Sequence, residues 1–183
     1  IDSSLSGENV DYDAYGDALA ILNMQYLLYQ KDPIKHATLF ETATKYYPKS
    51  GWCYRMLGMA YQNQEAYFRS KNAIFTAIEL QPNNRYSYEV LAEVYEAEGA
   101  FESSISSYRD AIRVVALDNE ENYSIDDEEY AKNLTALSKY HSNIAEIFLE
   151  MEDLSSAIAE YHKAISFNPD KSGGMYMFDL ASA

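Results

Sequence analysis

Apolar residues recur along the chain at every third or fourth position, in stretches that end near a proline. This spacing gives each stretch one apolar face when it is helical, so it predicts helices and not strands. Pro48 and Pro82 follow two of these stretches and lie 34 residues apart, and Pro169 follows a later one. The recurrence predicts helical units that begin at about Asp17, Gly51 and Arg85, and at Ser138 after an insertion of 19 residues.

Small and aromatic residues occupy matching places in these units. The unit at Gly51 has Tyr54, Leu57, Gly58, Tyr61, Ile74, Ala77 and Pro82, and the unit at Arg85 has Tyr88, Leu91, Ala92, Tyr95, Tyr108 and Ala111. The unit at Ser138 has His141, Ile144, Ala145, Phe148, Tyr161, Ala164 and Pro169. This pattern resembles the tetratricopeptide repeat, which reads W-x2-L-G-x2-Y, then A-x3-F, then P. The resemblance implies an all-α fold, a right-handed α-solenoid of helix-turn-helix repeats.

The same pattern divides the chain into three parts. Residues 1–13 are polar and predict an N-terminal arm, and residues 14–170 predict the solenoid with an acidic insertion at 118–137. Residues 171–183 predict the start of a further or capping helix. The unit at Asp17 fits the repeat less well, and only if its inter-helix turn around Lys31 and Pro33 is one residue longer.

The charge of the chain narrows the classes of partner. The formal net charge of -15 repels phosphate backbones and anionic lipid surfaces, so neither nucleic acid nor a bare membrane is expected to bind. No apolar run approaches the roughly 18 residues that span a bilayer, so we expect no direct membrane insertion. The single cysteine, Cys53, fits a reducing compartment. The compartment is left open, with an intracellular one (cytoplasm, or an organelle after removal of a targeting segment) favoured.

The insertion allows two interpretations. Residues 118–129 are mostly acidic, which predicts a solvated loop that leads into an extended helix from near Asp126. A calcium loop is the alternative, because its six ligand places fall on Asp118, Glu120, Asn122, Ser124, Asp126 and Glu129. The sixth place of such a loop requires glycine for a sharp turn, and here it is Tyr123. A calcium-responsive regulator therefore remains as the alternative function.

No catalytic motif is present in the sequence. It lacks G-x-S-x-G, G-x-G-x-x-G, a Walker-type phosphate loop and H-E-x-x-H. His36, His141 and His162 fall at three different places of the repeat, and Cys53 is distant from all of them in the repeat register. We therefore predict no catalytic residues, no metal ligands and no cofactor, and we expect that the chain is not an enzyme. A non-catalytic domain of a larger enzyme is a further alternative.

The resemblance also implies a binding surface. In tetratricopeptide proteins the first helix of each unit lines a concave groove, and places 2, 5, 6, 9, 12 and 13 of the unit point into it. The residues predicted to line it are Met24, Trp52, Arg55, Met56, Met59, Tyr86, Glu89, Val90, Glu93, Lys139, Asn143 and Glu146. This set is apolar and rich in methionine near its N-terminal end and acidic further along, so the expected ligand is a basic segment with an apolar anchor. The resemblance thus implies a protein-binding scaffold or adaptor that is a subunit or assembly factor of a larger hetero-complex.

Overall fold

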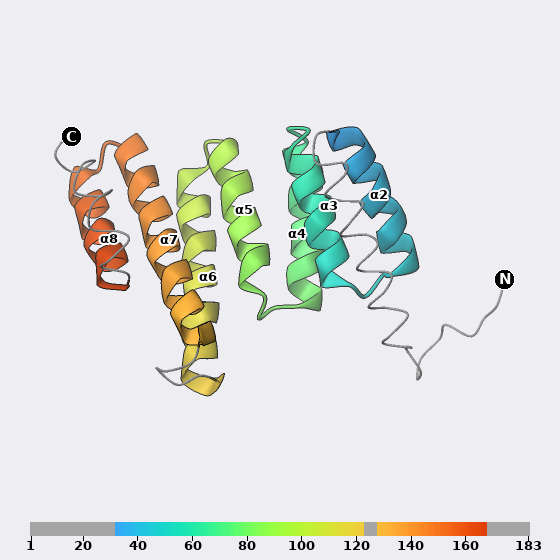
Figure 1. Ribbon diagram of the computed structural model, residues 1–183. Coiled ribbons are helices and arrows are strands. Elements are labelled where there is room, and N and C mark those ends of the chain that lie inside the picture. Colours follow the sequence, from blue (N-terminus) through green and yellow to red (C-terminus); the bar gives the residue numbers. More distant parts are fainter. Residues whose placement is uncertain (1–31, 123–127, 168–183) are drawn as a thin grey trace.

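The computed structural model describes residues 32–122 and 128–167, and all regular structure in these ranges is α-helical (Figure 1). Its helices are α2 (Pro33–Tyr46), α3 (Gly51–Gln62), α4 (Tyr67–Leu80), α5 (Arg85–Ala97), α6 (Phe101–Asn122), α7 (Glu128–Glu150) and α8 (Leu154–Phe167). The all-α prediction is confirmed for these residues. Met24, the N-terminal arm and residues 171–183 lie outside the described residues, and the division of the chain into domains stays a prediction.

The helices stand side by side in chain order (Figure 1), and they pair into helix-turn-helix units. The most extensive packing joins α3 to α4, α5 to α6 and α7 to α8, while α2 packs against α3. The predicted unit starts Gly51 and Arg85 are the first residues of α3 and α5. Helix α2 begins 34 residues before α4, so it is the second helix of the first unit.

Polar side chains cap the starts of four helices and supply acceptors to the backbone amides that have no partner inside the helix. Ser50 Oγ accepts from Cys53 N at 3.3 Å before α3, and Asn84 Oδ1 accepts from Tyr86 N at 3.1 Å before α5. Asp32 and Asp153 do the same for α2 and α8. These caps fix where each helix begins after its turn.

The turns inside units 2, 3 and 4 share one backbone conformation. Their equivalent residues, spaced by 34 and 53, have positive φ angles of 57° at Glu65, 74° at Gly99 and 61° at Glu152. In unit 2, Ala66 N donates to Tyr61 O at 2.9 Å and Glu65 N donates to Gln62 O at 2.8 Å, and the other two turns repeat both bonds. This is the Schellman arrangement that ends a helix on a left-handed residue. Only Gly99 adopts it without a steric cost.

Close approach of the two helices within a unit explains the small residues of the repeat. A Cβ atom added at Gly58 would lie 2.3 Å from Ile74 Cδ1, well inside van der Waals contact. Ser70 Oγ donates to Gly58 O at 2.8 Å, and in the next unit Ser104 Oγ donates to Ala92 O at 2.9 Å. The helix backbones therefore meet at a place where no larger side chain fits.

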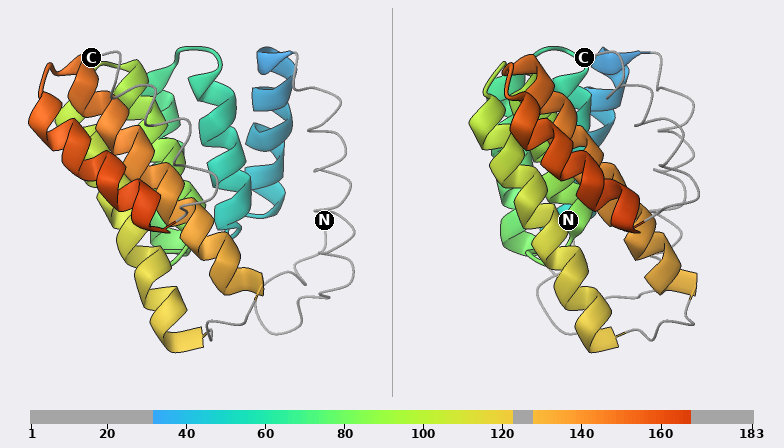
Figure 2. Two further views of the ribbon diagram at one scale, coloured as in Figure 1. Left: turned by 60° about the vertical axis from the view of Figure 1, so that its left-hand side comes forward. Right: turned by 90° about the vertical axis from the view of Figure 1, so that its left-hand side faces the viewer.

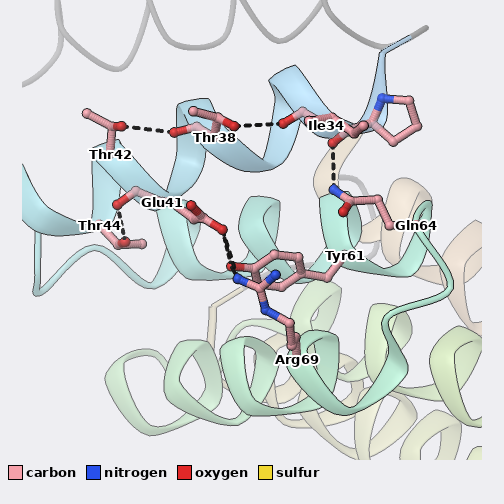
Figure 3. Close-up of polar contacts among 9 residues, drawn as sticks. Ile34, Thr38, Glu41, Thr42, Thr44, Tyr61, Gln64 and Arg69 are labelled. Atoms are coloured by element: carbon pink, nitrogen blue, oxygen red, sulfur yellow. Dashed lines mark hydrogen bonds and ion pairs between the residues drawn. The ribbon is translucent and has the colours of Figure 1, made fainter.

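A polar cluster joins the first two units across three helices (Figure 3). Glu41 on α2 accepts a hydrogen bond of 2.7 Å from Tyr61 Oη on α3 and forms an ion pair of 2.9 Å with Arg69 on α4. Burial and the adjacent Glu41 carboxylate raise the pKa of Tyr61 to about 12. The tyrosine is therefore a neutral donor over the physiological range, and it ties α2 to the following unit.

Helices α6 and α7 are longer than their counterparts. They have 22 and 23 residues, against 14 in α4 and 12 in α3, and their joined ends project beyond the other helices (Figures 1 and 2). Helix α7 begins ten residues before Ser138, and α6 includes residues 118–122. Those five residues cannot form the first half of a calcium loop, because they are helical. Residues 123–127 lie outside the described residues.

Candidate protein-binding face

Eleven of the predicted groove residues lie on α3, α5 and α7, the first helices of their units, and side-chain contacts connect several of them. We call this surface the first-helix face; its partly or fully exposed residues include Trp52, Arg55, Tyr86, Glu89, Glu93, Glu96, Lys139, Asn143, Glu146 and Glu150. Direct packing joins α3 to α5, and side-chain bonds join α5 to α7. The structure therefore places residues from three units on one connected surface.

Arginine and tyrosine occupy the end of this face near the N-terminus of α5. The guanidinium of Arg55 lies 5.2 Å from the ring centroid of Tyr86, and that of Arg85 lies 4.8 Å from it. Both arginines are thus held by cation–π contacts, while Tyr86 remains 46% exposed. An exposed aromatic ring in contact with two guanidinium groups is a composition typical of interface hot spots.

In the centre of the face, Glu89 connects α5 to α7. Its carboxylate forms an ion pair of 2.5 Å with Lys139 Nζ and accepts a hydrogen bond of 2.8 Å from Tyr140 Oη. Glu89 is mostly buried, whereas Lys139 is more than half exposed. This bridge fixes the position of unit 4 relative to unit 3.

The C-terminal halves of α5 and α7 carry a group of carboxylates, Glu93, Glu96, Glu146 and Glu150. Burial raises the pKa of Glu93, Glu89 adds to the increase, and Lys139 opposes it. Burial also raises the pKa of Glu96, with further contributions from Glu150 and Glu146. The last turns of both helices contain no basic residue, so the carboxylates also oppose the helix dipoles. The folded chain therefore holds negative charge here at an electrostatic cost.

The apolar part of the predicted groove needs correction. Met56 and Val90 are each 5% exposed and pack in the core, so the prediction that they contact a partner is wrong. Trp52 is half-buried, with its ring 5.4 Å from the Phe40 ring, and Met59 is half-buried against two core clusters. These two present only part of their surface.

Place 6 of the unit fails as a binding position for a common reason. It holds Met56, Val90 and Asn143 in units 2, 3 and 4, and in each unit it points between helices. Asn143 Nδ2 donates to Tyr108 Oη at 3.0 Å, and burial raises the pKa of that tyrosine. The amide is thus a structural group, although its outer edge remains partly exposed.

Sequence reasoning missed Arg85 and Tyr140 as members of this region. Arg85 stands at the first place of its unit, where the family pattern assigns no partner contact, and Tyr140 stands at the third. The sequence around Glu89 gives no sign of its bonds to Lys139 and Tyr140, because these partners are 50 and 51 residues away. Only the fold brings the side chains of α5 and α7 together.

The histidines do not form a reactive group. His141 Nδ1 lies 2.6 Å from Glu160 Oε2, and its ring stacks on Phe167 with centroids 5.5 Å apart. His36 is buried beside Phe40, and His162 is exposed on α8. Within residues 32–122 and 128–167, no group of three or more His, Cys, Asp or Glu side chains is arranged to hold a metal ion.

Comparison with known proteins agrees with this architecture. Residues 138–171 match the family model described as the tetratricopeptide repeat. No curated protein sequence matches the chain. The resemblance predicted from the repeat pattern is confirmed, and the matched residues begin at Ser138, the predicted start of unit 4.

Solved structures extend the likeness to the rest of the array. The N-terminal domain of stress-induced protein-1 (STI-1) from C. elegans is 23% identical with a TM-score of 0.58, covering 72% of this chain and 94% of that one. Pseudomonas aeruginosa pilF is 16% identical with a TM-score of 0.68, covering 93% and 69%. A MamA structure from Desulfovibrio magneticus RS-1 is 16% identical with a TM-score of 0.60, covering 79% and 71%. At these identities the likeness concerns the fold, which confirms the helical-repeat prediction.

The described helices also bear on the predicted relation to membranes. None of them combines the length and the hydropathy that a bilayer crossing requires.

Proposed function

We propose that this tetratricopeptide-repeat chain is a non-catalytic scaffold or adaptor, a subunit or assembly factor of a larger complex, and that its first-helix face binds a basic segment of a protein partner. Helical-repeat arrays commonly use the extended surface created by stacked units for protein binding. A ligand on the first-helix face would touch α3, α5 and α7 at once.

The observation that carries this proposal is the carboxylate group at Glu93, Glu96, Glu146 and Glu150. Two of these side chains have raised pKa values caused by burial and by their neighbours, so their negative charges repel one another in the free chain. A lysine or arginine from a partner would relieve this repulsion, which makes the face selective for basic segments and unfavourable to acidic ones. The half-exposed Trp52 and Tyr86 supply apolar contact for the same segment.

A charge-reversal pair tests the proposal. Proteins captured by the chain from its native source are identified, the bound segment is mapped on synthetic peptides, and the affinity of the best peptide is measured by calorimetry. Glu93→Lys combined with Glu96→Lys should weaken this affinity about tenfold or more and reduce its dependence on salt. The control is Glu79→Lys combined with Glu102→Lys, which makes the same change in net charge on exposed positions of α4 and α6.

Two results would contradict the proposal. One is that the control pair weakens binding as much as the pair on α5, which would mean that net charge and not the face matters. The other is that the mapped segment is acidic.

A further inference from the structure

A cavity of about 510 Å³ lies where the extended ends of α6 and α7 meet the turn between α4 and α5. It adjoins the first-helix face, because Tyr86 belongs to both. Its lining residues come from the turn (81–84), the start of α5 (Arg85, Tyr86), α6 (Val114, Val115, Asp118) and α7 (Glu129, Asn133). Three segments that are separate in sequence, 81–86, 114–118 and 129–133, thus form one recess.

One wall of this cavity exists only because of the insertion. Leu80, the last residue of α4, corresponds to Val114 in the next unit, yet α6 continues past that point and carries Asp118. Glu129 and Asn133 precede Ser138, where the regular unit begins. The turn between α4 and α5 therefore belongs to the regular repeat. The insertion adds the side chains of Asp118, Glu129 and Asn133 on the other side of the cavity.

The polar groups of the cavity form a linked series. Arg85 Nη1 donates to Asn133 Oδ1, Arg85 Nη2 donates to Tyr86 Oη at 3.0 Å, and Asn133 Nδ2 donates to Asp118 Oδ2 at 3.2 Å. Asn133 is 1% exposed, so this series is firmly held. The Nε–H of Arg85 is buried and has no acceptor in the part of the chain that the structure describes. A buried donor without a partner is costly, and an acceptor brought by a ligand would remove that cost.

The charges of the lining favour a cation. Asp118 and Glu129 contribute two negative charges and Arg85 one positive charge, which leaves a formal charge of -1 on the lining residues. Pro82, Val114 and the exposed ring of Tyr86 offer apolar surface beside these carboxylates. Apolar surface next to carboxylates suits a long side chain with a methylene stem and a cationic end.

We propose that this cavity binds an arginine or lysine side chain of the partner segment. The cation lies at Asp118 and Glu129, the stem lies on Pro82 and Val114, and a main-chain carbonyl of the segment accepts from Arg85 Nε. The insertion thereby gives the partner a second basic contact at the opposite end of the first-helix face from Glu96 and Glu150. This inference rests on the proposed function for the existence of a partner, but its chemistry can be measured without one.

The test uses Nα-acetyl-arginine N-methylamide as the probe and the whole chain as the receptor. We expect saturable changes in amide NMR shifts at residues 81–86, 114–118 and 129–133. The matching citrulline amide, which has the same shape without the charge, should bind about two- to fivefold more weakly. Glu129→Gln should weaken arginine binding by a similar factor.

Glu128→Gln is the matched control. Glu128 and Glu129 both pair with Lys132, at 3.1 and 3.3 Å, but only Glu129 lines the cavity. Glu128→Gln should leave the affinity for the probe unchanged. Val114→Trp, which fills the recess without altering charge, should abolish the shifts at residues 81–86.

The inference is overturned if citrulline binds as well as arginine, if the two glutamine variants behave alike, or if the shifts do not map to the cavity. Shifts confined to residues near Glu93, Glu96 and Glu146 would overturn the cavity assignment while supporting the first-helix face. Shifts at the cavity together with an acidic mapped segment would leave the cavity assignment in place and overturn the proposed function.

Discussion

Within unit 2, α3 and α4 touch through backbone and small side chains, whereas between units 3 and 4, α5 and α7 meet through charged and phenolic groups. The first contact has Gly58 against Ile74 and Ser70; the second has Glu89 against Lys139 and Tyr140. Contacts within a unit repeat from one unit to the next, because steric fit allows few alternatives. Contacts between first helices differ from one junction to the next, so the charged and phenolic groups at each junction are specific to it.

The largest expected effect is on the contact within a unit. Gly58→Leu should destabilise the fold by about 1 to 3 kcal/mol, because even a Cβ at this position overlaps Ile74. Ala145→Leu, at the equivalent place of unit 4, should behave alike. Chemical denaturation measures both variants against Ala159→Leu, an exposed position of α8 that should change stability by less than about 0.5 kcal/mol. Unchanged midpoints for the two buried variants would show that the helices do not cross there.

The serine bond to the facing helix should matter next. Ser104→Ala removes the donor to Ala92 O and should cost about 0.5 to 1.5 kcal/mol. Unit 4 already has Ala157 at this place, so the bond is not required for the fold. Ser103→Ala, one residue earlier and exposed, serves as the control. Because alanine has a higher helix propensity than serine, Ser103→Ala should not destabilise the chain. An equal loss in both variants would show that the bond to Ala92 is not the cause.

A change at the turn within a unit should raise stability. Glu152→Gly should stabilise the chain by about 0.5 to 1 kcal/mol, because φ is 61° and glycine adopts this conformation freely. Conversely, Gly99→Ala should destabilise by about as much, although a Cβ there would meet nothing within 4 Å. Thermal melts of the two variants should therefore shift in opposite directions, and a shift in the same direction would contradict the shared turn conformation.

The smallest effect concerns the contact between units. Burial and Glu89 raise the pKa of Glu93 above its unfolded value, so the folded chain binds this proton more tightly. By linkage, the corresponding stability is present at low pH and is lost as pH rises through the raised pKa. Glu93→Gln should therefore increase the free energy of unfolding at pH 7. The wild-type chain should become more stable on mild acidification, and this increase should be smaller in the variant. Urea midpoints across that range give the measurement, with exposed Glu102→Gln expected to follow wild type.

The fold could be predicted from the sequence because the small residues of the repeat pattern are required where the helices pack closely. Gly58, Ala92 and Ala145 recur where helices must approach, so the repeat spacing located the first residues of α3 and α5. The exposure of the groove residues was predicted less well. A place number in the repeat tells which side of a helix a residue is on, but not how far the neighbouring helix covers it, which is why Met56 and Val90 were assigned wrongly. The cavity at Arg85 could not be predicted, since it depends on how far α6 and α7 extend.

The extended pair of helices also removes an ambiguity that is inherent in repeats. Successive units superpose after a shift of one unit, so a partner that recognised only the regular pattern could bind in several registers. Helix α6 continues eight residues past Val114, or about 12 Å, and this projection occurs at one junction within the described residues. This projection therefore makes one junction different from the other junctions among the described residues. If the first-helix face binds a segment as proposed, that segment would therefore bind in a single register along the units. The same projection would also mark the orientation of this chain in images of a larger assembly.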